Sequence, residues 1–183
     1  MKQILRWLLP VAIALIAAGC SKERLDEHRY EFDAEWAAAY YYGTDAAGGV
    51  NCFQLDLAQG RTDADLDLIS TGAVVRLLIS APVADEIALP DGLYLGSDSR
   101  EDAYTFNCGT KLRDNTVSGS YVGLRPGGEK QTLVLPVDNG KVSVRLSGDD
   151  LYEVSAELRT GSKTFFFIYR GTIHTFDCTE PQQ

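Results

Sequence analysis

Residues 139–158 read NGKVSVRLSGDDLYEVSAEL and contain two runs in which apolar and polar side chains alternate. Every second residue is apolar over Val142–Leu146 and again over Tyr152–Leu158. A period of two is typical of a β-strand that buries one face against a core. The pair Asn139-Gly140 stands before the first run, and such a pair between alternating runs is a strong hairpin signal. The stretch therefore predicts antiparallel strands with a tight turn at Asn139-Gly140.

The same alternation occupies residues 30–42, where the even positions are aromatic or alanine and the odd positions begin with acidic residues. A helix through Glu35–Ala39 is the rival interpretation, because alanine is the best helix former. The aromatic, alternating flanks favour one strand whose even positions are buried. On that parity Tyr41 lies on the solvent face, beside buried Tyr40 and Tyr42.

Further strands are predicted at seven places bounded by Gly, Pro, Asp or Asn, namely residues 50–57, 73–81, 92–96, 103–108, 118–124, 131–137 and 163–173. The segment Arg125–Glu129 has two glycines after a proline and is predicted to be a hairpin turn. The strand at 163–173 is apolar at odd and even positions, so we expect it to be buried on both faces. No long helix is convincing. The predicted fold class is all-β, an antiparallel β-sandwich or barrel of about ten short strands.

The first 20 residues, MKQILRWLLPVAIALIAAGC, have a short positive start and an apolar run over Trp7–Ala18. The run is too short to span a bilayer, which takes about 20 apolar residues, and it has the architecture of a secretory signal. The end Ala17-Ala18-Gly19-Cys20 resembles the lipobox of bacterial lipoproteins, although that pattern prefers Leu where Ala17 stands. The resemblance implies acylation of the Cys20 thiol. Several acyl chains give stable anchoring, so we expect attachment to a membrane through Cys20.

Ser21, and not Asp, follows Cys20, and by resemblance to lipoprotein sorting in Gram-negative bacteria this favours the outer membrane. Attachment on the periplasmic side and display on the cell surface both stay open. The predicted organisation has four parts: a cleaved lipoprotein signal peptide (1–19), the lipidated cysteine with a charged tether (20–29), a single all-β domain (30–178) and a tail (179–183). Cleavage leaves 183 − 19 = 164 residues, enough for one core and too few for two ordinary domains.

The chain carries 17 basic and 26 acidic residues, a net charge of −9, which becomes −11 when Lys2 and Arg6 leave with the signal peptide. So acidic a protein repels phosphate backbones, which excludes nucleic-acid binding as a default. The two histidines, His28 and His174, are too few to favour histidine-based catalysis or a His-rich metal site. The chain also lacks the Gly-x-Ser-x-Gly motif of serine nucleophiles. We therefore expect no enzyme, no catalytic residue and no cofactor.

Three cysteines remain besides Cys20, and exported proteins commonly meet an oxidising compartment. One disulfide among Cys52, Cys108 and Cys178 is expected, and the sequence does not select its pairing. A nucleophilic Cys178 would need a base within hydrogen-bond reach. His174 precedes it by four residues on one strand, which separates the two by about 13 Å. These cysteines are therefore expected to be structural or free.

The run Asp63-Ala64-Asp65-Leu66-Asp67 has the oxygen spacing with which an EF-hand loop begins. That loop requires Gly at its sixth position and Glu at its twelfth, where this chain has Leu68 and Val74. A calcium loop of another type stays open. The simpler interpretation is a solvated acidic segment, and no metal site is predicted.

Nine Tyr, seven Phe and two Trp make the aromatic side chains the remaining lead to a ligand. Most of these rings are expected to pack in the core. Exposed rings on β-sandwiches commonly stack on sugars, and Tyr41 is expected on the solvent face. Tyr41 is therefore the one candidate binding residue, and its expected ligand is a glycan.

Three segments read LPDGLY at 89–94, GKVSV at 140–144 and FIYRG at 167–171. They resemble a turn, a strand and an aromatic strand of small lipoproteins from Bacteroidales. The resemblance covers most of residues 30–177 and implies an all-β lipoprotein domain in the cell envelope of a gut-type anaerobe. It carries over no catalytic residue.

These observations predict a lipid-anchored envelope protein that is a non-catalytic binding module for a glycan or a protein. The alternative is a structural or assembly subunit of an outer-membrane complex. An exposed aromatic patch in a groove would favour the binding module. A long unpaired edge strand or a large flat apolar patch would favour the assembly subunit.

Overall fold

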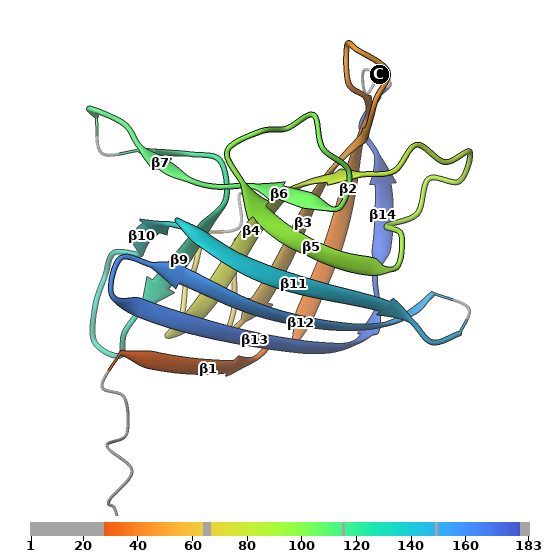
Figure 1. The fold of residues 1–183 in the computed structure, drawn as a ribbon. Coiled ribbons are helices and arrows are strands. Elements are labelled where there is room, and N and C mark those ends of the chain that lie inside the picture. Colours follow the sequence, from red (N-terminus) through yellow and green to blue (C-terminus); the bar gives the residue numbers. More distant parts are fainter. Residues whose placement is uncertain (1–27, 64–66, 115, 149, 180–183) are drawn as a thin grey trace, which may run out of the picture.

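The computed structural model of the protein describes residues 28–63, 67–114, 116–148 and 150–179. These residues form fourteen strands and no helix (Figure 1). The strands are β1 (Arg29–Asp33), β2 (Trp36–Thr44), β3 (Asn51–Gln59), β4 (Gly72–Ala81), β5 (Gly92–Ser97), β6 (Thr105–Asn107), β7 (Thr110–Lys111), β8 (Val117–Ser118), β9 (Tyr121–Arg125), β10 (Leu133–Pro136), β11 (Asn139–Leu146), β12 (Leu151–Thr160), β13 (Lys163–Thr172) and β14 (His174–Asp177).

Twelve strands form one mixed sheet in the order β1-β13-β12-β11-β5-β6-β4-β3-β2-β14. Two of the twelve lie off this path, because β9 pairs with β4 and β10 pairs with β9. The strands β7 and β8 form a small separate hairpin. The large sheet is not closed, and β1 and β14 are the two ends of its path.

The sheet folds over so that its two halves face each other across one core (Figure 1). The front layer contains β5, β11, β12, β13 and β1, and the back layer contains β9, β4, β3, β2 and β14. Both layers contribute to the core, whose largest fully buried side chains include Tyr94, Tyr152, Phe53, Phe106, Phe165 and Phe167. Removing these rings from water is the main contribution that stabilises such a fold.

The alternation at 139–158 is confirmed. Strands β11 and β12 pair antiparallel with Val142 opposite Ala156, and both of these side chains are buried. Ser143 and Ser155 lie opposite each other on the outer face. Predicted strands at 50–57 and 73–81 likewise match β3 and β4, with alternate residues in the core.

The predicted turn at Asn139-Gly140 is wrong. These two residues are the first of β11 and pair with Arg159 and Leu158 of β12. A Cβ atom at Gly140 would lie 2.4 Å from the carbonyl oxygen of Glu157, so glycine serves a close approach of two backbones there. Strand β10 pairs instead with β9, through the turn that was predicted over 125–129.

Residues 30–42 form two strands in different layers, not one. The N–H of Ala34 donates to the carbonyl of Ile168 in the front layer, and the N–H of Glu35 donates to the carbonyl of Ala58 in the back layer. The chain therefore crosses between the layers at Ala34–Glu35. The crossing changes the parity, so that the predicted burial of even positions fails in β2 at Trp36 and Tyr42, whereas Ala38 is buried although it faces away from the core.

The antiparallel prediction is only partly right, because three strand pairs are parallel: β1 with β13, β2 with β14, and β5 with β6. The first two pairs share one cause. The run β13–β14 crosses between the layers beside the run β1–β2, so the two runs stay parallel in both layers. The predicted burial of the last long strand on both faces is also wrong, since Ile168 of β13 is 46% exposed.

Candidate functional site

The outer face of the back layer carries a group of exposed aromatic rings. On β2 the residues Ala37, Ala39 and Tyr41 face the core, which turns Tyr40 and Tyr42 outward. Tyr40 stands opposite Phe176 of β14, and their rings stack with centroids 5.3 Å apart. Tyr42 is 51% exposed and Phe176 is 50% exposed. We call Tyr40, Tyr42 and Phe176 the aromatic face.

Polar side chains of β3 and β4 continue the same outer face. The amide nitrogen of Gln54 donates to Asp56 Oδ2 at 2.6 Å, and Arg76 Nε donates to Asp56 Oδ1 at 3.1 Å. The Asp56 side chain is fully buried, although it points away from the core. Burial raises the pKa of Asp56 above its ordinary value, and the hydrogen bond from Arg76 opposes that rise. The guanidinium of Arg76 also lies 5.5 Å from the ring centroid of Tyr121.

A hollow of about 420 Å³ lies beside Tyr42 on this face, and we call it the back hollow. Its outward-facing residues on β3 and β4 include Cys52, Gln54 and Ser80, and Tyr42 and Arg100 also line it. Ser80 donates to the carbonyl of Arg100 at 2.9 Å, which ties the Arg100 backbone to β4. An exposed ring beside amide, hydroxyl and guanidinium groups suits a ligand with both apolar and hydroxyl-bearing surfaces.

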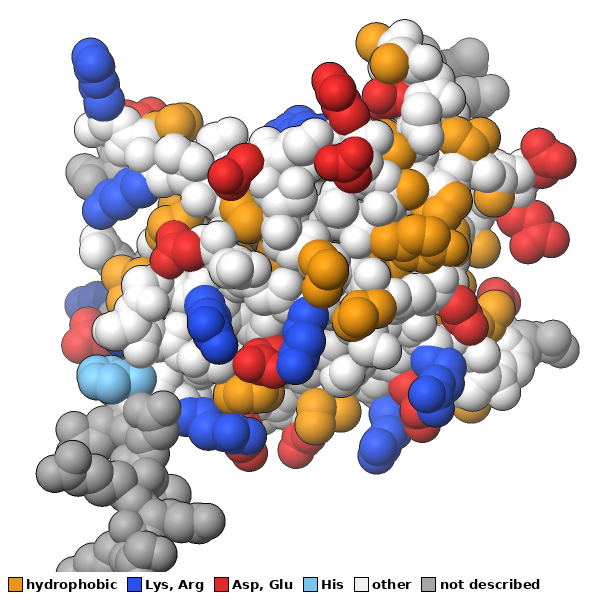
Figure 2. Space-filling model, viewed as in Figure 1, with side chains coloured by type: hydrophobic (Ala, Val, Ile, Leu, Met, Phe, Trp, Pro, Cys, Tyr) orange, Lys and Arg blue, Asp and Glu red, His pale blue; other side chains and the backbone are white. Residues whose placement is uncertain are grey.

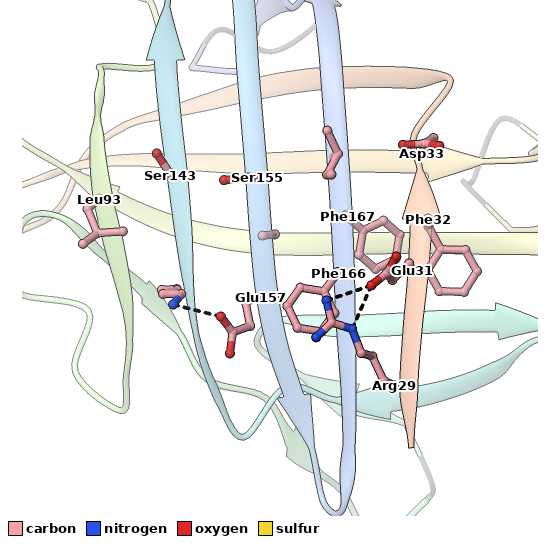
Figure 3. A pocket seen from close by; sticks show the side chains of 13 residues that line it. Arg29, Glu31, Phe32, Asp33, Leu93, Ser143, Ser155, Glu157, Phe166 and Phe167 are labelled. Atoms are coloured by element: carbon pink, nitrogen blue, oxygen red, sulfur yellow. Dashed lines mark hydrogen bonds and ion pairs between the residues drawn. The ribbon is translucent and has the colours of Figure 1, made fainter. Parts of the chain in front are cut away.

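A second hollow, of about 500 Å³, lies on the outer face of the front layer (Figure 3). Leu93, Ser143, Ser155, Ile168 and Asp33 follow one another across five neighbouring strands. The two serines in the middle of this row are short, which leaves space between the longer side chains around them. We call it the front hollow.

Most charged groups around the front hollow are already paired. Arg29 bonds Glu31 at 2.7 Å, and Lys141 Nζ lies 2.9 Å from Glu157 Oε2 (Figure 3). Arg29 also covers the Phe166 ring, with 4.0 Å from its guanidinium carbon to the ring centroid. Figure 2 shows acidic and basic side chains interspersed over this front view, with apolar side chains between them. The front hollow therefore offers less free aromatic surface than the aromatic face.

The structure places Tyr41 on the core-facing side of β2, where it is partly buried and packed against the core. Its ring lies 5.1 Å from that of Phe53, and its hydroxyl donates to Asn51 Oδ1 at 3.4 Å. The expected exposure of Tyr41 beside buried Tyr40 and Tyr42 is therefore wrong. Its neighbour Tyr42 has the exposure that was expected of Tyr41. Shifting the predicted burial pattern of β2 by one residue would have identified Tyr42.

Cys52, Cys108 and Cys178 are all free thiols, so the expected disulfide is not formed. The N–H of Cys178 donates to the carbonyl of Tyr41, which places Cys178 on the far side of β2 from Cys52. Two strand spacings separate the two cysteines by about 10 Å, beyond the Cα separation of a disulfide. Burial raises the pKa values of the Cys52 and Cys108 thiols, which keeps both protonated near neutral pH.

The acidic run of residues 63–67 is only partly described, because Asp65 lies outside the described residues. Asp63 Oδ1 accepts a hydrogen bond from the N–H of Asp67 at 2.9 Å. The described residues contain no group of three or more His, Cys, Asp or Glu that could hold a metal ion. Nor does any helix among them have the length and apolar character needed to cross a membrane. Cys20 lies outside the described residues, and its lipidation stays a prediction.

No protein family, curated protein or solved structure matches the chain, so the all-β domain is assigned to no family.

Proposed function

We propose that this protein is a lipid-anchored envelope protein whose all-β domain is a non-catalytic binding module for a glycan. The aromatic face and the back hollow are the proposed site. The observation that supports it is the half-exposed ring of Tyr42 at the wall of a hollow lined by Gln54, Ser80 and Arg100.

The chemistry of this site matches a sugar in two ways. A sugar ring has an apolar face of C–H groups, which packs on an aromatic ring, and a rim of hydroxyls. The side-chain amide of Gln54 supplies a donor and an acceptor for those hydroxyls, and Arg100 supplies donors, whereas the hydroxyl hydrogen of Ser80 is already donated to the carbonyl of Arg100. A mostly apolar site with a few placed polar groups is the usual composition of a small-ligand site.

The alternative assembly role has less support. A long unpaired edge strand or a large flat apolar patch was expected to favour it. The edge strands β1 and β14 have only five and four residues. Apart from Tyr42 and Phe176 of the aromatic face, several exposed large apolar side chains come from separate strands and loops, such as Ile69, Val83, Leu112 and Leu151.

Binding is tested by screening the purified protein on a glycan array and titrating the best hit by calorimetry. Tyr42→Ala should weaken binding about fivefold, since losing a stacked ring costs about 1 kcal/mol. Tyr42→Phe keeps the ring and should stay close to wild type. Ile168→Ala is the matched control, because Ile168 is similarly exposed but lies on the front layer. The proposal fails if no glycan binds, or if the control weakens binding as much as Tyr42→Ala.

The lipid anchor and the orientation need separate tests. Cys20→Ala should release the protein from membranes without unfolding it. Protease shaving of intact cells, against a periplasmic control protein, should separate the two orientations. Cleavage while the control survives would place the domain on the surface, and protection would direct the search to ligands inside the outer membrane.

A further inference from the structure

We infer that the free edge of β1 binds an extended peptide segment of a partner protein, which adds to the sheet as a strand beside β1. This inference does not rest on the glycan proposal, because β1 ends the front layer and the aromatic face lies on the outside of the back layer.

The backbone of β1 is hydrogen-bonded on one side only. In a parallel pair every second residue turns its N–H and C=O toward the neighbouring strand. The N–H of Ala34 donates to the carbonyl of Ile168, which fixes the even residues of β1 as those that bond β13. The odd residues Arg29, Glu31 and Asp33 therefore turn their backbone groups to the other side. Within the described part of the chain no strand pairs with that side.

The neighbouring strand ends just before it would cover this edge. Strand β3 pairs with β2, and the last bond on this side joins the N–H of Glu35 to the carbonyl of Ala58. The chain then turns away at Gly60, which has a φ of +96°. A Cβ atom there would lie 2.7 Å from the carbonyl oxygen of Thr71. Glycine allows this sharp turn, and the turn leaves β1 without a partner.

An apolar hollow lies on the inner side of the free edge. It has a volume of about 600 Å³ and is lined by Tyr30 and Phe32 of β1, by Leu124 of β9 and by Leu133 of β10. Tyr30 and Phe32 point toward the core yet stay partly exposed, and Leu133 is 48% exposed. A strand added beside β1 would direct every second side chain into this hollow, which selects apolar residues at alternate positions.

The charged side chains of β1 indicate one further feature of the partner peptide. On the outer face of β1 the carboxylate of Glu31 is paired with Arg29, whereas Asp33 has no ion pair within the described residues. The hollow itself is lined by Glu35 and by two cations, Arg125 and Lys163, so the preference for a cationic partner rests on Asp33 of the outer face. The occupant is therefore an extended peptide with apolar residues at alternate positions and a lysine or arginine opposite Asp33.

The test uses fluorescein-labelled heptapeptides in which leucine or phenylalanine alternates with threonine, each with and without one lysine. Fluorescence anisotropy with the purified protein should give saturable binding, stronger for the lysine-containing peptides. Methylating the backbone nitrogens at one parity should abolish binding, and methylating the other parity should leave it intact. This dependence on parity is the signature of strand addition, and it needs no variant of the protein.

Variants of β1 provide the matched comparison. Glu31→Pro removes an N–H that faces the free edge and leaves the bonds to β13 in place, so it should abolish peptide binding. Glu31→Ala loses the same carboxylate but keeps the N–H, and it should bind like wild type. Asp33→Asn should weaken only the lysine-containing peptides, about two- to fivefold. Leu133→Asp should weaken all of them.

Three outcomes would overturn the inference: no peptide binds, binding survives Glu31→Pro in a folded variant, or methylation at either parity has the same effect. Sedimentation at rising protein concentration adds a fourth. Self-association of the wild type that Glu31→Pro abolishes would make a second copy of this chain the occupant and overturn the peptide proposal.

Discussion

On both outer faces of this folded sheet, every second side chain of a strand points away from the core. The two faces differ in how far other residues cover these outward side chains. On the front face the ion pairs Lys141–Glu157 and Arg170–Glu153 remain in contact with water, with 30% to 75% of each side chain exposed. On the back face the outward carboxylate of Asp56 is fully buried and bonded to Arg76. A side chain that points away from the core is therefore not necessarily exposed.

Neighbouring residues on the back face explain this burial. Leu68, from the loop between β3 and β4, packs on the outward side chains Ala58 and Val74 and forms a second small core. Next to that cluster, Arg76 lies against both Asp56 and the Tyr121 ring. The back face thus has interior-like electrostatics at Asp56, whereas water screens the charges of the front face.

The largest expected effect follows from removing the partner of a buried charge. Arg76→Ala leaves Asp56 buried without its cation, and we expect a loss of about 3 to 5 kcal/mol in the free energy of unfolding at pH 8. Urea denaturation measures it. The double variant Asp56→Leu with Arg76→Met removes both charges and should recover most of the loss. A loss below about 1 kcal/mol for Arg76→Ala would mean that water reaches Asp56.

The next largest effect is a difference in the free energy of unfolding between variants on the two faces of β2. Tyr41→Ala removes a ring that packs on Phe53 and should cost about 2 to 3 kcal/mol, less than a fully buried ring would. Tyr42→Ala removes an exposed ring and should change stability by no more than about 0.5 kcal/mol. Thermal and urea unfolding of both variants would measure the difference. Equal losses would contradict the parity of β2.

Local alternation predicted those parts of the fold in which one strand stays in one layer. Strands β11 and β12 are such a case, since every second residue faces the core over 142–144 and 152–158, although Leu146 at the end of β11 is 43% exposed. Residues 30–42 are not, because the chain crosses between layers at Ala34–Glu35 and changes parity there. Nothing in the local pattern of Ala and aromatic residues marks this crossing. It depends on bonds to Ile168 and Ala58, which are distant in sequence.

The same limit applies to Asn139-Gly140. As a dipeptide it favours a two-residue turn, but the tertiary structure uses Gly140 for close contact with the backbone of β12. By contrast, the turn at 125–129 was correctly predicted, because proline fixes its own φ and glycine allows a positive φ, here +87° at Gly128, whatever surrounds them. A turn can be predicted from the sequence when the conformational preferences of its own residues determine it.

The candidate site was only partly predictable. An exposed ring on β2 was expected, and the parity error assigned that exposure to Tyr41 and not to Tyr42. The sequence does contain a signal for the polar cluster, since Asp56 interrupts a run of apolar residues in β3. Its partners Gln54 and Arg76 become visible only with the register of β3 and β4.

The two faces should respond to pH in opposite directions. Burial raises the pKa of Asp56, so its contribution to stability is full below the ordinary value of 3.8 and is lost as the pH rises through the raised value. A hydrogen bond from Lys141 lowers the pKa of Glu157, so its contribution is present above 4.5 and is lost as the pH falls through the lowered value. Urea midpoints from pH 3 to 8 would test this for the wild type, Asp56→Asn and Glu157→Gln.

The sign of each difference decides the test. Relative to Asp56→Asn, the wild type should lose stability as the pH rises above about 4. Relative to Glu157→Gln, it should lose stability as the pH falls below about 4. If the two differences in urea midpoint changed in the same direction with pH, this result would contradict the contrast in burial between the two faces.

The smallest expected effect is on the front face. Arg170 and Glu153 are 75% and 47% exposed, with 3.5 Å between Nε and Oε1. Water already solvates both groups, so their attraction barely exceeds the entropy lost in fixing two long side chains. Arg170→Ala should therefore change the free energy of unfolding by less than about 1 kcal/mol, and added salt should remove most of that change. A loss as large as that of Arg76→Ala would mean that burial does not distinguish the two ion pairs, and the contrast between the faces would need another cause.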